Sequence, residues 1–175
     1  MANTPTTLRR VMRWWPPYLG AGVRVVEADP AGRHLTVEHR VTRWTRNAFG
    51  TAFGGTMASM TDPFFCLLIA HRLGSGYRVW DTQGHIVFRT PGHGRLRATF
   101  VVTDEDLAQI REATDEGQKH LRWFRTAIVD ESGTVVADVS REVYVRRARV
   151  TTSEQAPHEE SPTRADRPTG GTVRG

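Results

Sequence analysis

The chain has 175 residues, the size of one domain with a tail, and its single cysteine, Cys66, excludes an internal disulfide framework and a multi-cysteine metal site. The net charge is +5, and almost all of the positively charged side chains are arginines. Arginine suits phosphate or carboxylate partners but identifies none of them. No aromatic–basic motif indicates nucleic acid as a partner, and neither a signal-peptide pattern nor a membrane-spanning segment is evident, so we expect a cytoplasmic protein without stable membrane insertion.

Residues 1–17 are expected to form an N-terminal amphipathic helix. Apolar residues recur at helical spacing between Pro5 and Trp15, and Pro16 and Pro17 should end the helix. Arginines occupy the opposite face, as in helices that lie on membranes. Because the segment is only about three turns long, we favour a helix docked on the domain.

Two strands should follow, at residues 23–29 and 35–41, with a turn between them. The first is rich in β-branched residues, and the second alternates apolar and polar side chains, which indicates one buried face. The sequence "DPAG" between them is typical of a turn.

The second half of the chain alternates strands with one short helix. A glycine inside the first of these strands, Gly84, indicates a bulge or a close approach of another group to the backbone. After residue 150 apolar residues nearly vanish, so the tail, 150–175, is expected to be disordered. The expected strands are 77–90, 96–102, 120–130 and 134–147, and the short helix is 104–116.

A glycine-rich loop leads into the longest apolar stretch of the chain, residues 57–70. Asp62 lies inside that stretch, and a carboxylate on an apolar helix is costly unless it has a partner or a task. One buried helix and about six strands joined by short turns predict an α+β domain, at residues 18–149, in which an antiparallel sheet wraps around one long central helix.

The loop and the helix together suggest chemistry. Gly50, Gly54 and Gly55 allow the backbone to approach a ligand and leave N–H groups free at a helix start, where they can hold a developing oxyanion. Asp62 follows about two turns later, and Asn47, before the loop, can orient a carbonyl or a water. A structural interpretation fits the same residues: a tight turn that feeds a core helix, with Asp62 hydrogen-bonded to neighbouring groups.

The stretch "NAFGTAFGGTMASMTD", from Asn47 to Asp62, resembles the signature of hot-dog-fold acyl thioesterases of the phenylacetyl-CoA thioesterase type. That signature is Asn, two residues, Gly, two residues, His-Gly-Gly, and an acidic residue seven positions on. The sequences "FGG", "DPFF" and "VWD" are also similar to an uncharacterised hot-dog subfamily that has Asp-Pro in the central helix. The resemblance implies a hot-dog fold and a homodimer or dimer of dimers, with acyl-thioester sites between subunits.

The resemblance also implies roles for particular residues. Asp62 would act as general base or nucleophile, the Gly55 N–H would polarise the thioester carbonyl, and Asn47 would help to place the carbonyl or the water. This chain departs from the signature at Phe53, which replaces the usual histidine, and at Pro63, which should kink or loosen the helix. The expected substrate-binding residues are Gly54, Phe53, Ser59, Trp80 and Arg89.

Two further expectations concern residues outside the signature. Trp80 should pack at an acyl pocket or a subunit interface, and its neighbour Asp81 should pair with an arginine. Arg89 and the arginines at 95 and 97 form a basic edge that can meet coenzyme A phosphates or an acyl-carrier protein, although a solvated face is the common role for any one of them.

The leading hypothesis is an acyl-thioester hydrolase that acts on acyl-CoA or a carrier-linked acyl group. It needs no metal and no cofactor, because coenzyme A or phosphopantetheine is part of the substrate. One alternative is a hot-dog protein that binds acyl ligands without hydrolysis, in which Asp62 is structural. Another is a dehydratase or cyclase that acts on the acyl chain.

Overall fold

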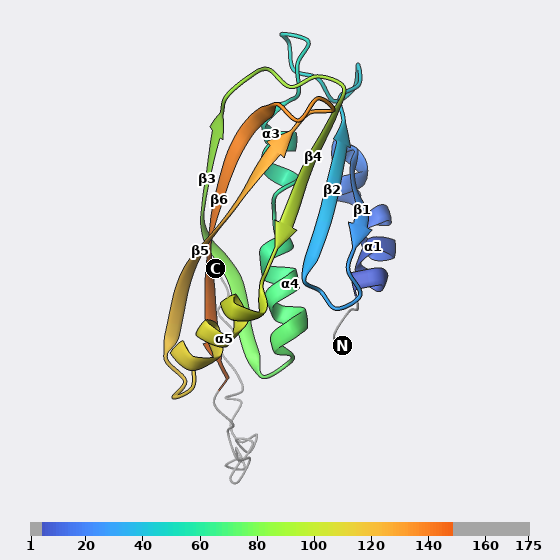
Figure 1. Ribbon diagram of the computed structural model, residues 1–175. Coiled ribbons are helices and arrows are strands. Elements are labelled where there is room, and N and C mark those ends of the chain that lie inside the picture. The colour runs from blue at the N-terminus through green and yellow to red at the C-terminus, as the bar shows by residue number, and fades with distance from the viewer. Residues whose placement is uncertain (1–4, 149–175) are drawn as a thin grey trace, which may run out of the picture.

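Six antiparallel strands form one sheet that curves around two central helices (Figure 1). The strand order is β1-β2-β4-β5-β6-β3, so β3 lies at one edge and β1 at the other. The computed structural model describes residues 5–148, and it confirms the hot-dog fold and each expected strand to within two residues. The strands are β1 Val23–Ala28, β2 His34–Arg40, β3 Tyr77–Phe88, β4 Arg95–Val101, β5 Lys119–Val129 and β6 Val135–Arg147.

The central helix is not continuous, in contrast to the single long helix that the apolar run predicts. It consists of α3 (Gly54–Ser59) and α4 (Phe64–Leu73), with Asp62 and Pro63 in the break between them. The peptide bond between Asp62 and Pro63 is cis. Pro63 also has no N–H to continue the helical ladder. The kink expected at this proline is a complete interruption, since α3 ends at Ser59 and α4 begins at Phe64.

The N-terminal segment forms two helices, α1 (Pro5–Trp14) and α2 (Pro16–Ala21). The prolines end α1 as expected, but Pro16 also opens α2, because a proline at a first helical position sacrifices no hydrogen bond. On α1, Met12 is buried where the helix packs against β1, whereas Val11 is 51% exposed and does not share that face. The expected disordered tail lies outside the described residues.

The core lies between α4 and the inner face of the sheet. Phe64 and Phe65 on the first turn of α4 are fully buried, and both rings lie 5.1 Å from the ring of Phe100 on β4. On β4, buried Leu96, Ala98 and Phe100 alternate with exposed residues, so one face of this strand is turned to the core. No helix among residues 5–148 is long and apolar enough to cross a membrane.

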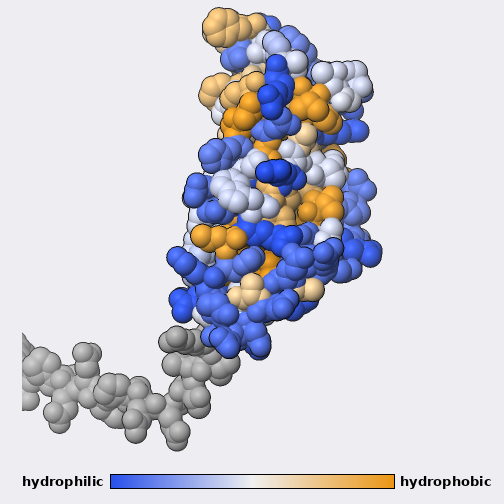
Figure 2. All heavy atoms as spheres, turned by 60° about the vertical axis from the view of Figure 1, so that its left-hand side comes forward, coloured by the Kyte–Doolittle hydropathy of each residue, from blue (hydrophilic) through white to orange (hydrophobic). Residues whose placement is uncertain are grey.

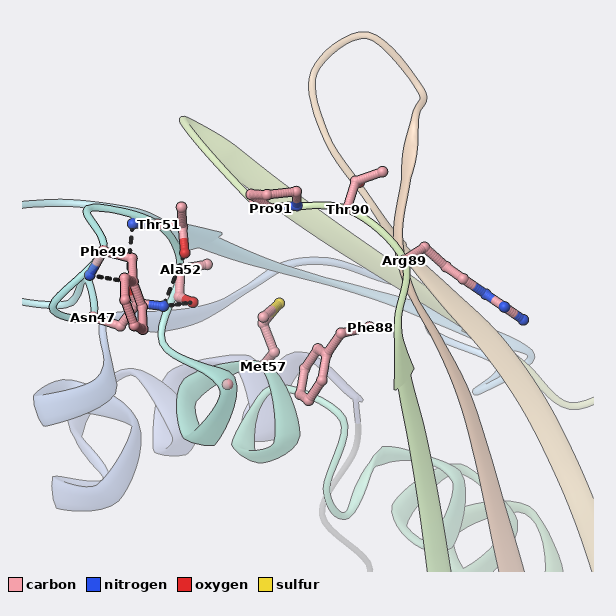
Figure 3. Close-up of a pocket in the computed structure, with 11 residues that line it drawn as sticks. Asn47, Phe49, Thr51, Ala52, Met57, Phe88, Arg89, Thr90 and Pro91 are labelled. Atoms are coloured by element: carbon pink, nitrogen blue, oxygen red, sulfur yellow. Dashed lines mark hydrogen bonds between the residues drawn. The ribbon is translucent and has the colours of Figure 1, made fainter.

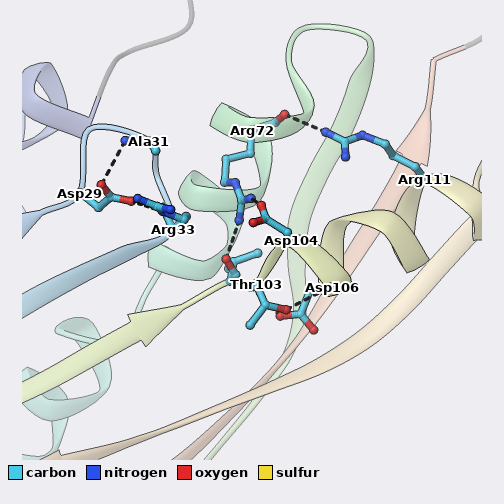
Figure 4. A network of polar contacts seen from close by, with 9 residues as sticks. Asp29, Ala31, Arg33, Arg72, Thr103, Asp104, Asp106 and Arg111 are labelled. Atoms are coloured by element: carbon cyan, nitrogen blue, oxygen red, sulfur yellow. Dashed lines mark hydrogen bonds and ion pairs between the residues drawn. The ribbon is translucent and has the colours of Figure 1, made fainter.

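A polar network fastens the short helix α5 (Asp104–Ala113) to the end of α4 (Figure 4). Thr103 and Asp106 form a capping box at the start of α5, since each side chain accepts a hydrogen bond from the other's backbone N–H. Arg72, on the last turn of α4, donates to the carbonyl of Val102 and pairs with Asp104. These contacts hold the C-terminal end of α4 in place.

We expect a buried histidine to make stability depend on pH. His39 on β2 is fully buried; one ring nitrogen lies 3.4 Å from the carbonyl oxygen of Gly22, and the other has no hydrogen-bond partner among the described residues. Burial lowers the pKa of His39 below its ordinary value of 6.5, so on acidification the unfolded chain takes up a proton that the folded chain does not. The free energy of unfolding should therefore fall as the pH decreases through 6.5.

Urea unfolding at pH 7.5 and pH 5.5 measures this effect. In His39→Leu the difference in unfolding free energy between the two pH values should shrink, because one of the titrating groups is gone. Equal differences in the parent and the variant would show that another group, such as the partly buried His120, causes the dependence.

Candidate functional site

Asp62 lies at the break between α3 and α4, and its side chain is 52% exposed. The buried, apolar setting that the sequence suggests for it is therefore wrong, because the interruption of the helix turns this residue outward. One carboxylate oxygen of Asp62 lies 3.4 Å from Nη1 of Arg141, a β6 residue whose own side chain is only 14% exposed. The carboxylate thus meets water on one side and a fixed positive charge on the other.

Arg141 also holds the backbone that carries Asp62. Its Nη2 donates to the carbonyl oxygen of Ala58 and to Oγ1 of Thr61, both at 3.1 Å. From the other side, the hydroxyl of buried Tyr18 on α2 donates to the carbonyl oxygen of Asp62 itself. Burial raises the pKa of this phenol, which therefore remains a hydrogen-bond donor at neutral pH.

Gly84 makes room for Arg141. The two residues are direct cross-strand partners, and a Cβ atom on Gly84 would lie 2.7 Å from Nη1 of Arg141. The guanidinium can therefore cross over β3 only because residue 84 has no side chain. The close approach that the sequence suggests at this glycine is confirmed, and the β3–β6 register also shifts nearby, between Asp81 and Gln83.

A second carboxylate, Asp81 on β3, points toward α4. Its Oδ1 accepts a hydrogen bond from the thiol of Cys66 at 3.2 Å, so the partner is a cysteine rather than the expected arginine. Burial raises the pKa of Asp81, and the nearby negative charge of Asp62 raises it further. Burial also raises the pKa of the Cys66 thiol, which fits an unreactive cysteine.

Asn47 organises the glycine-rich loop. Its amide nitrogen donates to Oγ1 of Thr51 at 2.9 Å and to the carbonyl oxygen of Ala52 at 3.3 Å, and its amide oxygen accepts from the N–H groups of Phe49 and Thr51. These bonds use both donors of the amide. Asn47 shapes the loop, and its action on a substrate remains a prediction.

Within residues 5–148, the first backbone N–H groups of α3 have no hydrogen-bond acceptor. Phe53 is the N-cap residue, and its side chain makes no capping hydrogen bond to the N–H groups of the first turn, among them that of Gly55. The ring of Phe53 lies against Gly55, where a Cβ would be 2.4 Å from the ring. Because α3 has only six residues, these N–H groups lack the support of the long-helix dipole that the sequence suggests.

Two cavities flank α3. The first, of about 520 Å³, has a mostly apolar lining, and its volume is in the range of small-molecule sites (Figure 3). In Figure 3 the side chain of Arg89 points away from Met57; its Nε lies 2.6 Å from the carboxylate of Asp138. The lining residues are Asn47, Phe49, Thr51, Ala52, Gly54, Met57, Phe88, Arg89, Thr90, Pro91 and Gly92.

The second cavity, of about 410 Å³, lies on the other side of the α3 start. Ser59 lines it, and its hydroxyl donates to the carbonyl oxygen of Gly55 at 2.9 Å. The lining residues are Gly20, Ala21, Trp44, Thr45, Arg46, Phe53, Gly55, Thr56 and Ser59.

The structure divides the expected site residues into groups. Asn47, Gly54 and Arg89 line the first cavity, whereas Phe53, Gly55 and Ser59 line the second. Asp62 and Trp80 line neither; Trp80 stacks on Tyr144 at a ring distance of 3.9 Å and is 45% exposed. Within residues 5–148, no group of three His, Cys, Asp or Glu side chains converges as metal ligands would.

Sequence reasoning missed Arg141, which is 79 positions from Asp62. The only sign of it was Gly84, a glycine inside a strand, where a neighbouring group can approach closely.

Solved structures with the same fold come from bacteria and from a vertebrate. A probable thioesterase of Pseudomonas aeruginosa, PA5026, has a TM-score of 0.74 and 19% identity, over 82% of this chain and 96% of that one. The Escherichia coli PaaI protein of the phenylacetic acid degradation operon has a TM-score of 0.58 and 18% identity, over 81% of this chain and 91% of that one. Zebrafish thioesterase superfamily member 2 has a TM-score of 0.59 and 19% identity, over 81% and 97%.

The likeness to these structures confirms the hot-dog fold that the sequence resemblance implies. No curated protein matches the chain in sequence. The model of one family, DUF4442, described as a domain of unknown function, matches residues 5–145. The chain therefore belongs to the DUF4442 family.

Proposed function

We propose that the protein hydrolyses acyl thioesters of coenzyme A or of an acyl-carrier protein, in the cytoplasm. The observation that carries this proposal is the setting of Asp62: a carboxylate open to solvent, at a break in the central helix, and oriented by a buried arginine. The free N–H of Gly55 at the start of α3 supplies the second element that thioester hydrolysis requires.

In the proposed reaction, Asp62 accepts a proton from water as the water oxygen attacks the thioester carbonyl carbon. The Gly55 N–H donates to the carbonyl oxygen while negative charge develops on it. The carbon–sulfur bond then breaks, and the free acid leaves together with a thiolate that takes up a proton. The apolar cavity of about 520 Å³ beside Gly54 is proposed to hold the acyl chain.

We propose that two copies of the chain complete each site, in a homodimer or dimer of dimers. Asp62 and Gly55 do not line a common cavity in one chain, so a second copy is needed to bring a carboxylate to a free N–H. The edge strand β3 supports this arrangement: it has 12 residues, and β6 is its only neighbour in the described sheet. A long unpaired edge favours pairing with another strand.

The surface of β3 also suits a partner. Trp80, Val87 and Phe88 are each at least 45% exposed. Figure 2, which brings this side of the molecule forward, shows apolar patches among polar residues. Exposed apolar side chains beside a free strand edge are typical of an interface.

Sedimentation analysis should therefore give a mass of at least twice the 19.7 kDa of the chain. Val87→Glu should weaken association at least about tenfold, because it places a charge at the apolar edge. Val101→Glu is the matched control: this valine is similarly exposed, at 50%, but it is on β4, away from the β3 edge. A monomeric parent, or equal effects of the two changes, would contradict the dimer.

The decisive experiment is a panel of acyl-CoA and acyl-carrier thioesters with detection of the free thiol. Release of thiol supports hydrolysis, and the preferred acyl group identifies the substrate. Acyl ligand binding without release would instead favour the non-hydrolytic alternative. Conversion of the acyl chain without free thiol would favour a dehydratase or cyclase.

A further inference from the structure

A third cavity, of about 400 Å³, opens on the outer face of β1, β2 and β4. This is the face turned away from the helices, since Val23, His39 and Leu96 are buried on the opposite side of the same strands. Arginine dominates the polar lining. The lining residues are Gly22, Arg24, Glu38, Arg40, Thr42, Thr45 and Arg95.

Two arginines of this cavity lie side by side on adjacent strands. Arg40 on β2 and Arg95 on β4 are direct cross-strand partners. Like charges at directly opposite positions destabilise a sheet. A bound anion between these strands would reverse that repulsion.

The carboxylates around the cavity are already engaged. Glu38 lies opposite Arg24 on β1 but pairs instead with Arg97, at 2.9 Å. Glu131 lies 3.5 Å from Arg95. Within the described part of the chain, neither Arg24 nor Arg40 has an ion-pair partner. Among the described residues, two of the three arginines in the cavity are therefore left without a direct ion pair.

The third cavity adjoins the second cavity, which Gly55 lines. Thr45 lines both, and Ala21 in one is followed in the chain by Gly22 in the other. A molecule that extends from the Gly55 N–H through the second cavity is therefore directed toward the cavity that Arg24 and Arg40 line. A thioester joined through a long arm to a phosphate has this shape.

We propose that Arg24 and Arg40, with Arg95 beside them, bind a phosphate group of the coenzyme A or phosphopantetheine arm of the substrate. This inference rests on the proposed thioester hydrolysis, which places the thioester at the Gly55 N–H and the carrier arm in the second cavity. Arginine suits the task because its planar fork donates two hydrogen bonds to one phosphate. The cavity thus accounts for the recognition of the carrier rather than the acyl chain.

The test compares thioesters with the same acyl group: acyl-CoA, acyl-4′-phosphopantetheine and acyl-pantetheine, which has no phosphate. Arg24→Gln and Arg40→Gln should each raise KM for acyl-CoA about tenfold, the expected effect of losing a hydrogen bond between charged groups. Neither should change KM for acyl-pantetheine. Arg125→Gln is the matched control, because Arg125 is an exposed arginine on β5 outside this cavity and loses the same charge.

Acyl-4′-phosphopantetheine identifies which phosphate is bound. If the variants also impair its hydrolysis, the cavity binds the phosphate of the arm itself; if they impair only acyl-CoA, it binds the nucleotide phosphates. Equal effects on acyl-CoA and acyl-pantetheine, or an equal effect of Arg125→Gln, would overturn the proposal.

Calorimetric titration with free coenzyme A separates this proposal from the proposed hydrolysis. If the parent cleaves no thioester but binds coenzyme A, and Arg24→Gln and Arg40→Gln weaken binding about tenfold while Arg125→Gln does not, the phosphate site stands without the reaction. If the parent cleaves thioesters and the variants bind coenzyme A as the parent does, the phosphate site is wrong and the reaction stands.

Discussion

Asp62→Asn should lower kcat for thioester hydrolysis about 10²–10⁴-fold, the usual contribution of a general base. The amide has nearly the same shape as the carboxylate but cannot accept a proton from the attacking water. Because the Asp62 side chain is 52% exposed and its pair with Arg141 is long, at 3.4 Å, the substitution should change the free energy of unfolding by less than about 1 kcal/mol. Steady-state kinetics and urea unfolding of the same preparation measure the two effects.

Asp115→Asn is a suitable control for this experiment. Asp115 is also an exposed carboxylate paired with an arginine, Arg147, and neither residue lines the cavities beside α3. It should keep kcat within about twofold of the parent. If Asp62→Asn retains full hydrolysis in a folded protein, Asp62 is not the base, and its pair with Arg141 is structural.

Arg141→Gln should reduce both stability and kcat. The change removes the donors to the carbonyl of Ala58 and the hydroxyl of Thr61, so we expect the free energy of unfolding to fall by about 1–3 kcal/mol. Asp62 then loses its anchor, and a displaced base should lower kcat about 10–100-fold with little change in KM. Arg141→Lys should restore part of the activity, since it retains the charge but not the fork of donors.

Gly84→Ala tests the same anchor without altering any charge. The new Cβ would lie 2.7 Å from the guanidinium of Arg141 and would push it off its path to Asp62. We expect a kcat defect in the range of Arg141→Gln. Gly76→Ala is the matched control, because a Cβ there meets nothing within 4 Å. If Gly84→Ala behaves like Gly76→Ala, the position of Arg141 does not matter for hydrolysis.

The strands of the sheet were predictable because the sequence patterns that indicate them lie within each strand and turn. Alternation of apolar and polar residues on β4 reflects one buried face, and that alternation is a property of the strand's own sequence. The turn at Asp29 was also evident, since its side chain accepts hydrogen bonds from the N–H groups of Ala31 and Arg33 within the turn.

The break in the central helix was predictable only in part. Pro63 indicates a kink, but the size of the interruption depends on Tyr18 and Arg141, which hold the break from α2 and β6. Such contacts join residues far apart in the sequence, and hydrophobic periodicity contains no information about them. The exposure of Asp62 follows from the same contacts, so its apolar surroundings were wrongly inferred.

The candidate site follows the same pattern. The glycine-rich loop, with Asn47 and Gly55, was recognisable because its residues are adjacent in the chain. The partner of Asp81 was not: a buried carboxylate can be satisfied by arginine or by another donor, and only packing against α4 brings the Cys66 thiol to it.

The interruption between α3 and α4 replaces a main-chain connection by a side-chain one. A continuous helix would join the Gly55 end of the central element to the core aromatics through one ladder of backbone hydrogen bonds. Here Tyr18 joins them: its ring lies 5.7 Å from the ring of Phe64 on α4, and its hydroxyl donates to the carbonyl oxygen of Asp62. A change of core packing at Phe64 therefore reaches the backbone of Asp62 through the Tyr18 ring rather than along a helix.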